Sequence, residues 1–311
     1  MTRRNRIDHN RLVPFDDLIP MAFSRTLYWL TLCILPLSVW ADKAEKCDRL
    51  YDAAKYHEAM ACYMQPDVRN DPGMMSRIGY MHNHGQGVPA DPEEALRWYR
   101  RSAEAGFPPG QFNLGIMYET GTGVPQDDHE AAKWFLKAAE QGLPEAEEKM
   151  GYFYASGTGV TKDYREAMKW FRRAVEHGNT SACSSIGILY DNGNGVSIDH
   201  NRAVQYYIMG AMGGDAQAQA LLAFKYLLGG GLSKDKRRAA YWFEQAANNG
   251  YPVAMQQMVK IYTYGRYGYD RDPEKAEYWQ NRYNQTIDEQ RKTGSRSVEP
   301  PLPFSLPSLT D

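Results

Sequence analysis

The segment LGIMYETGTGVPQDDHEAAKWFLKAAEQG, residues 114–142, decides the fold because related copies of it recur every 36 residues. Four copies open with a large aliphatic residue before a glycine, at Ile78-Gly79, Leu114-Gly115, Met150-Gly151 and Ile186-Gly187, and the frame continues as Leu222-Ala223 and Met258-Val259. A tyrosine, a Gly-x-Gly loop, an aspartate, an alanine, an aromatic residue and a closing glycine follow in the same frame. Self-similarity at a fixed period of this size is typical of a solenoid of stacked units.

The first half of each unit is predicted to be a helix, called helix A below. Leu114, Met117 and Tyr118 lie at i, i+3 and i+4, so they share one face of this helix. Gly115 costs about 1 kcal/mol of helix propensity. That cost is tolerable if the missing side chain lets another helix approach closely. The loop glycines end helix A, because glycine adopts backbone angles that other residues resist.

The second half of each unit is predicted to be a second helix, helix B. Asp127 is placed to cap it, and Glu130 three residues later completes a capping box. The predicted packing stripe comprises Ala131, Trp134, Phe135 and Ala138. Gly142-Leu143-Pro144 then ends the helix. We therefore predict an all-α fold, an α/α solenoid of stacked helix–turn–helix repeats.

The ends of the chain depart from this repeat. Residues 42–72 are predicted to form a divergent N-terminal helical hairpin, in which Cys62 occupies the tryptophan position. The repeat solenoid is predicted over residues 73–290. The divergent copies at its ends would act as caps, which an open stack of repeats requires. The Pro/Ser-rich segment 291–311 is predicted to be a disordered tail.

Residues 1–41 are predicted to be an export signal. The apolar run 27–37 is shorter than the ~20 residues that a membrane-spanning helix needs. Small residues at Val39 and Ala41 predict cleavage after Ala41, and Met21 would start a signal of ordinary length. An uncleaved membrane anchor is the alternative. We expect a periplasmic or secreted protein with no integral membrane span after cleavage.

Export would place the cysteines in an oxidising compartment, which permits a disulfide. Cys47 and Cys62 are the local candidates, and a bridge between them would tie the two helices of the first hairpin together. Cys183 is then left over, and we interpret it as a small buried residue rather than a reactive thiol.

The whole series resembles a known family. Leu-Gly-x-x-Tyr, Gly-x-Gly-Val, Asp, Ala, Trp-Phe, Ala and Gly at this spacing look like the Sel-one-like repeat, a relative of the tetratricopeptide repeat, over about 73–283. The resemblance implies a right-handed superhelix and an adaptor that holds other proteins, often in bacterial envelopes or secretory compartments. Some secreted cysteine-rich members have been linked to β-lactam binding or hydrolysis, but here only the first hairpin has a cysteine pair.

The sequence gives little sign of chemistry. The 311 residues carry a net charge of −2, which disfavours nucleic acid as the main partner. The segment Ser233-Lys234-Asp235-Lys236 matches SxxK and Lys292-Thr293-Gly294 matches KTG, but no SDN lies between them. His82-Asn83-His84 lacks an evident third metal ligand. We predict no catalytic residue, no cofactor and no metal site.

Partner binding is predicted on a stripe along helix A. The residue after the glycine lies about 200° around the helix from the core aliphatic residue. In successive units this position carries Tyr80, Ile116, Tyr152, Ile188, Phe224 and Lys260. These side chains would line a groove for an extended peptide or a protein face. The alternative is that neighbouring A helices bury them against each other.

We therefore expect an exported, monomeric adaptor that binds another protein or an extended peptide. On this interpretation Tyr152→Ala weakens partner capture and changes stability by no more than ~1 kcal/mol. Two alternative functions stay open at this point. Family analogy suggests a β-lactam or peptidoglycan-directed hydrolase, and the 22 Tyr and 7 Trp suggest a glycan-binding module.

Overall fold

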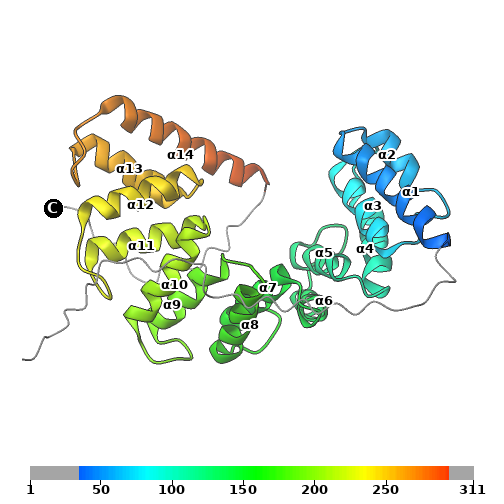
Figure 1. The fold of residues 1–311 in the computed structure, drawn as a ribbon, viewed down its shortest axis with the longest axis horizontal. Coiled ribbons are helices and arrows are strands. Elements are labelled where there is room, and N and C mark those ends of the chain that lie inside the picture. Colours follow the sequence, from blue (N-terminus) through cyan, green and yellow to red (C-terminus); the bar gives the residue numbers. More distant parts are fainter. Residues whose placement is uncertain (1–34, 294–311) are drawn as a thin grey trace, which may run out of the picture.

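The computed structural model describes residues 35–293, and every regular element in this range is an α-helix. The fourteen helices of this range are α1 (Leu35–Asp52), α2 (Tyr56–Tyr63), α3 (Pro72–His84), α4 (Pro92–Glu104), α5 (Pro108–Thr120), α6 (Asp128–Glu140), α7 (Pro144–Ser156), α8 (Tyr164–Glu176), α9 (Ala182–Asn192), α10 (His200–Met212), α11 (Ala216–Leu228), α12 (Lys236–Asn248), α13 (Pro252–Tyr264) and α14 (Pro273–Thr293). Figure 1 shows them as a curved row of helices. The predicted all-α solenoid is confirmed.

The helices pack as hairpins in series. From α3 onward each odd-numbered helix is a helix A, packed against the even-numbered helix B that follows it. Each helix B also contacts the next helix A, and α3 contacts α5 directly. In Figure 1 the two ends of the row rise on the same side of its middle, and α5 and α7 lie on that side of α6 and α8.

The glycine in helix A makes room for an aromatic ring of helix B. A Cβ atom on Gly115 would lie 2.7 Å from the Phe135 ring, and one on Gly151 would lie 2.5 Å from the Phe171 ring. Both distances are below a normal contact between carbon atoms, so a larger residue would displace the ring. The expected close approach of the two helices is therefore found within each of these hairpins.

The second glycine of each loop brings the loop against the preceding hairpin. A Cβ atom on Gly123 would lie 2.4 Å from the carbonyl oxygen of Pro92. Gly123 also has a φ of 67°, in the left-handed region. This glycine therefore joins successive hairpins, a role that the sequence interpretation, which assigned the loop glycines only to helix ends, had missed.

Aspartate side chains cap the B helices as predicted. Oδ1 of Asp127 accepts a hydrogen bond from the backbone N–H of Glu130 at 3.0 Å. The predicted capping box is wrong in its second half, because the backbone N–H of Asp127 donates to the carbonyl of Tyr118. The Glu130 side chain forms an ion pair with Lys133 on the surface of α6 instead.

The first hairpin contains the predicted disulfide. Cys47 on α1 and Cys62 on α2 are bonded, with their Cα atoms 5.5 Å apart. Cys183 is a free, buried cysteine, and burial raises the pKa of its thiol to about 11. A thiol held in its neutral form is a poor nucleophile, so this environment fits the structural role expected for Cys183.

The predicted signal and tail fall mostly outside the described residues. Of residues 1–41, the first 34 lie outside them, and α1 starts at Leu35 and continues across the predicted cleavage site after Ala41. The tail from residue 294 to 311 also lies outside them. Within the described range, no helix combines the length and hydropathy of a transmembrane span.

Candidate partner-binding surface

The predicted stripe is accessible at the N-terminal end of the stack. Tyr80 on α3 has 37% of its surface exposed, and its ring stacks on His84 with the ring centroids 4.0 Å apart. Ile116, at the same position on α5, is half-buried, and Lys260 on α13 is exposed. Tyr80 and Ile116 therefore offer an aromatic and an aliphatic contact on neighbouring A helices.

The same position is part of the core nearer the C-terminus. Ile188 on α9 is 8% exposed, and Phe224 on α11 is fully buried. The Phe224 ring meets the ring of Phe243 edge-on at 4.9 Å. The interpretation of these two residues as surface anchors is wrong, because the helices packed around α9 and α11 cover them. The alternative that packed helices bury the stripe holds for this part of the stack.

Tyr152 on α7 lies between these two extremes. It is half-buried, and its ring contacts Phe171 edge-on at 5.1 Å. Its hydroxyl accepts a hydrogen bond from Ser185 on α9 at 3.1 Å, and burial raises the pKa of that hydroxyl. Tyr152 therefore packs α7 against α8 and α9, and removing its ring will cost more stability than the sequence interpretation allowed.

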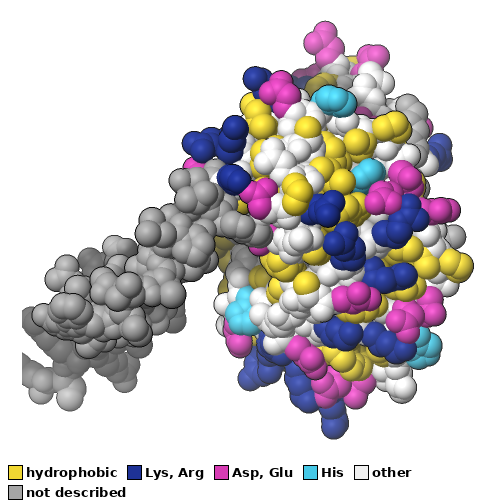
Figure 2. All heavy atoms as spheres, turned by 90° about the vertical axis from the view of Figure 1, so that its right-hand side faces the viewer, with side chains coloured by type: hydrophobic (Ala, Val, Ile, Leu, Met, Phe, Trp, Pro, Cys, Tyr) yellow, Lys and Arg dark blue, Asp and Glu magenta, His cyan; other side chains and the backbone are white. Residues whose placement is uncertain are grey.

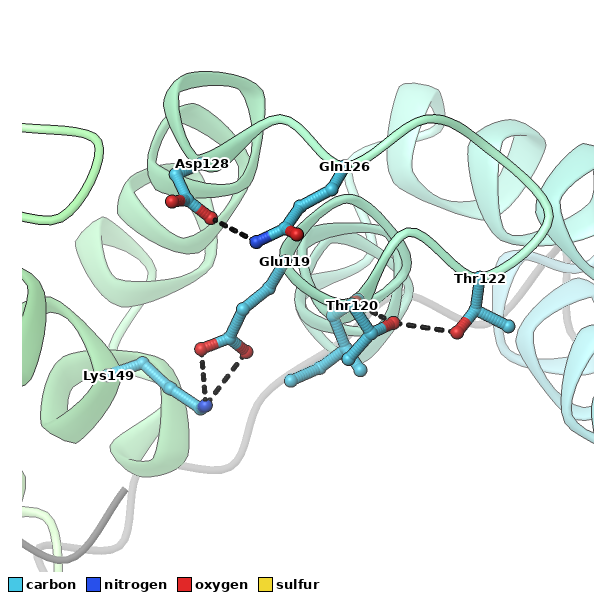
Figure 3. Close-up of polar contacts among 7 residues, drawn as sticks. Glu119, Thr120, Thr122, Gln126, Asp128 and Lys149 are labelled. Carbon is cyan, nitrogen blue, oxygen red and sulfur yellow. Dashed lines mark hydrogen bonds and ion pairs between the residues drawn. The ribbon is translucent and has the colours of Figure 1, made fainter. Parts of the chain in front are cut away.

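Polar side chains link α3 to α5 and α5 to α7 beside this stripe. Nζ of Lys149 on α7 lies 2.8 and 2.9 Å from the two carboxylate oxygens of Glu119 on α5, as Figure 3 shows. Asn113 on α5 donates to Ser76 on α3 at 3.2 Å. These contacts hold α3, α5 and α7 at fixed spacings. Sequence reasoning missed them because the paired residue types change from unit to unit.

We use the name A face for Tyr80, Ile116 and Tyr152 together with these polar links on α3, α5 and α7. Figure 2 views the end of the row formed by the N-terminal helices and shows basic, acidic and hydrophobic side chains interspersed there. Basic side chains therefore do not gather into a single patch on this end of the row, as a nucleic-acid site would require.

An acidic notch adjoins the A face. It is a cavity of about 600 Å³ where α7, α9 and α11 begin, and its lining includes Glu145, Glu148, Ser181 and Asp215. Glu148, one helical turn before Tyr152, accepts hydrogen bonds from Ser181 at 2.6 Å and from Asn179 at 2.9 Å. No pattern in the sequence had pointed to it, since its residues come from separate segments of two successive repeats.

Burial raises the pKa of one carboxyl group in the notch. Burial, with a smaller contribution from the nearby Glu148 carboxylate, raises the pKa of Asp215 to about 6, despite the opposing effect of the hydrogen bond from the Ala218 N–H. The notch can accept hydrogen bonds and attract a basic group. In the described part of the chain, no group of three or more His, Cys, Asp or Glu is placed to hold a metal ion.

The SxxK and KTG matches noted in the sequence lie apart from the A face, whereas His84 of the paired-histidine motif lies beside Tyr80 on it. Ser233 is exposed in the loop between α11 and α12, and Lys292 and Thr293 are at the end of α14. Gly294, the last residue of the KTG match, is outside the described residues. Nδ1 of His84 lies 2.9 Å from the carbonyl oxygen of Tyr80, in the preceding turn of its own helix.

The geometry can be compared with known proteins. The family model for the Sel1 repeat matches the chain six times, at residues 72–107, 108–143, 144–179, 180–215, 216–251 and 253–279. The chain belongs to the Sel1 repeat family. The matched ranges follow the 36-residue units, and the disulfide-bonded hairpin precedes them. A comparison with curated protein sequences gives no match.

Solved structures of Sel1 repeat proteins share the fold. A Sel1 repeat protein from Oxalobacter formigenes is 46% identical over 78% of this chain and 96% of its own, with a TM-score of 0.74. The protein c5321, a protective antigen present in uropathogenic Escherichia coli strains, is 31% identical with a TM-score of 0.64. That match covers 82% of this chain and 58% of c5321, so the chain spans little more than half of that protein's length.

Proposed function

We propose that this Sel1 repeat protein is an exported adaptor that binds another protein or an extended peptide and has no catalysis of its own. The scaffold-type fold usually mediates protein interaction. The observation that carries the proposal is the A face, where exposed Tyr80 and half-buried Ile116 lie on adjacent helices whose spacing is fixed by polar links. Aromatic residues on a rigid surface are common binding anchors, since little entropy is lost when they are covered.

The acidic notch adds selectivity to this surface. Glu148 lies on the same helix as Tyr152, so a polypeptide following the A face reaches the notch at α7. Glu145, Glu148 and Asp215 would favour a lysine or arginine of the partner and disfavour an acidic residue there. The partner proposed for the A face is therefore a polypeptide with an apolar anchor and a basic residue further along.

The proposed location is the periplasm or the extracellular space, after cleavage behind Ala41. The Cys47–Cys62 disulfide supports this proposal, because structural disulfides persist in oxidising compartments and are rare in the cytosol. The proposed working form is a monomer, since the A face needs no second copy to complete it.

Capture of the partner by variants of the exported protein tests this function. Wild-type protein, Tyr80→Ala and Tyr241→Ala would be incubated with envelope and culture fractions of the native host, and bound proteins quantified by mass spectrometry. Tyr241 on α12 is 51% exposed and far from the A face in sequence, so it is the matched control. We expect Tyr80→Ala to lose at least about tenfold of a specific partner and Tyr241→Ala to retain it. Equal capture by the two variants would contradict the proposal.

A further inference from the structure

A second cavity, of about 540 Å³, lies at the junction of the third and fourth repeats. Arg172 on α8 and Tyr190 on α9 line it, and α10 contributes Arg202, Gln205, Tyr206 and Met209. None of these residues belongs to the A face or to the acidic notch. Arg172 and Arg202 are exposed, so an incoming group can reach both guanidinium groups.

The two arginines converge on a single uncharged oxygen. Arg172 donates to the hydroxyl of Tyr190 at 2.9 Å, and Arg202 donates to the same hydroxyl at 3.4 Å. Arg202 also has Asp199 at 3.3 Å, whereas no carboxylate lies within ion-pair distance of Arg172 among the described residues. The pair therefore has one carboxylate for two positive charges, and each guanidinium keeps unused N–H donors.

This pairing of arginines occurs at this junction and is absent from its neighbours. At the first junction Arg100 bonds to Tyr118, but Glu130 occupies the position equivalent to Arg202. At the junction after the cavity, Arg238 is present, but Ile208 occupies the position equivalent to Arg172. The repeat frame alone therefore does not require two arginines here, since other junctions form the same packing with one.

The aromatic residue of the cavity is also unusual. In the earlier repeats a basic side chain lies over the helix B tryptophan, as Lys137 lies over Trp134 at 3.7 Å. At the cavity the equivalent pair is Tyr206 and Met209, and Met209 is 42% exposed. Tyr206 stacks on Tyr190 with ring centroids 5.9 Å apart. Tyr206 and Met209 thus form an apolar surface in the same cavity as the two guanidinium groups.

We propose that this cavity binds an aspartate or glutamate side chain of an acidic segment in a protein partner. Two guanidinium groups on one side match the two oxygens of a carboxylate, which would accept charge-assisted hydrogen bonds from both. Tyr206 and Met209 would contact the aliphatic stem. A nucleic-acid backbone fits less well, because Leu136 and Ile208 interrupt the arginine position and leave no basic stripe.

This inference rests on the proposed function only in taking a polypeptide as the partner. The basic cavity and the acidic notch have opposite charge, so they would receive different parts of one partner or two segments of it. The two sites share no lining residue, so each can be tested while the other is intact.

Peptide binding tests the proposal with the full exported protein. The probe is Gly-Glu-Glu-Gly-Glu-Glu-Gly, acetylated and amidated and carrying an uncharged dye, and its fluorescence anisotropy is measured at low salt. The same peptide with glutamine in place of glutamate is the first control, and a twelve-residue single-stranded thymidine oligonucleotide is the second. We expect the glutamate peptide to bind at least about tenfold tighter than either control.

Variants assign the binding to the cavity. Arg172→Gln and Arg202→Gln should each weaken binding about tenfold, while Arg100→Gln, which removes one arginine from the equivalent place at the first junction, should leave it unchanged. Arg202→Glu introduces the residue found at this position in three other repeats, so it should fold normally and abolish binding. Circular dichroism checks the fold of each variant.

Several outcomes would overturn the proposal. They are equal binding of the glutamate and glutamine peptides, equal or tighter binding of the oligonucleotide, and equal losses in Arg172→Gln and Arg100→Gln. Tyr80→Ala should not affect the peptide titration. If the peptide does not bind, the proposal of partner capture through the A face is therefore unaffected. If Tyr80→Ala does not reduce partner capture, the proposal for the arginine cavity is likewise unaffected.

Discussion

Replacing Lys225 with methionine should destabilise the junction between the fourth and fifth repeats. Nζ of Lys225 on α11 lies 2.6 Å from Oδ1 of Asp191 on α9, and both side chains are less than a tenth exposed. Asp191 also accepts from the Tyr207 hydroxyl at 2.8 Å and lies 2.8 Å from Nδ1 of His200. Methionine occupies the Lys225 position in the first two repeats, so its shape suits the site.

The expected loss of unfolding free energy for Lys225→Met is about 3 kcal/mol. Removing one partner of a buried ion pair leaves the other charge uncompensated, and Asp191 retains only the hydrogen bonds from Tyr207 and His200. The double variant Lys225→Met/Asp191→Asn removes both charges and keeps an acceptor for Tyr207, as Asn83 occupies the same position in the first repeat. It should recover to within about 1 kcal/mol of wild type.

Urea denaturation followed by circular dichroism measures these changes. The matched control is Lys149→Met, because the Lys149–Glu119 pair links α5 and α7 but is 28% and 20% exposed. That change should cost less than Lys225→Met, under about 1 kcal/mol, since this pair is more accessible to solvent and its attraction is more strongly screened. A loss below 1 kcal/mol for Lys225→Met, or a double variant less stable than Lys225→Met, would refute the reasoning.

Three further predictions concern the first hairpin, the notch and the A face. The double variant Cys47→Ser/Cys62→Ser should unfold with about 3 kcal/mol less stability, because the disulfide closes a 15-residue separation, and equal melting temperatures with and without the bridge would contradict this. The folded pKa of Asp215, about 6, exceeds its unfolded value of about 3.9, so its contribution to stability falls as pH rises from 4 to 7. Asp215→Asn should therefore gain up to about 3 kcal/mol on wild type at pH 7 and lose that advantage at pH 4 in urea titrations. Tyr152→Ala should cost about 2–4 kcal/mol by the same assay, and a loss under 1 kcal/mol would show that Tyr152 is a surface residue.

The sequence alone was sufficient to predict the repeating helix pairs of this fold. Glycines placed for close helix approach, aspartate caps and a period of 36 residues all report local constraints, and the first four repeats carry all of them. Gly115 against Phe135 shows why the prediction succeeded, because no larger residue fits at that point. The Cys47–Cys62 bridge was predictable for a similar reason, since the frame placed both cysteines on one hairpin.

The binding surface was predictable only in part. The position of Tyr80 also carries Phe224, yet one is exposed and the other is buried, because burial there depends on how neighbouring A helices pack. A periodic pattern gives the direction of a side chain relative to its own helix and does not report that packing. The acidic notch and the arginine cavity escaped for a different reason, since both arise from residues that depart from the repeat.

Photo-cross-linking from single positions on the exported protein tests the central claim most directly. Benzoylphenylalanine would replace Tyr80 or Ile116 on the A face, or Tyr241 or Tyr278 on exposed surfaces of α12 and α14, in living cells of the native host. The account predicts that positions 80 and 116 yield the same cross-linked protein and that positions 241 and 278 do not. Cross-links to that protein from 241 and 278, with none from 80 and 116, would contradict it.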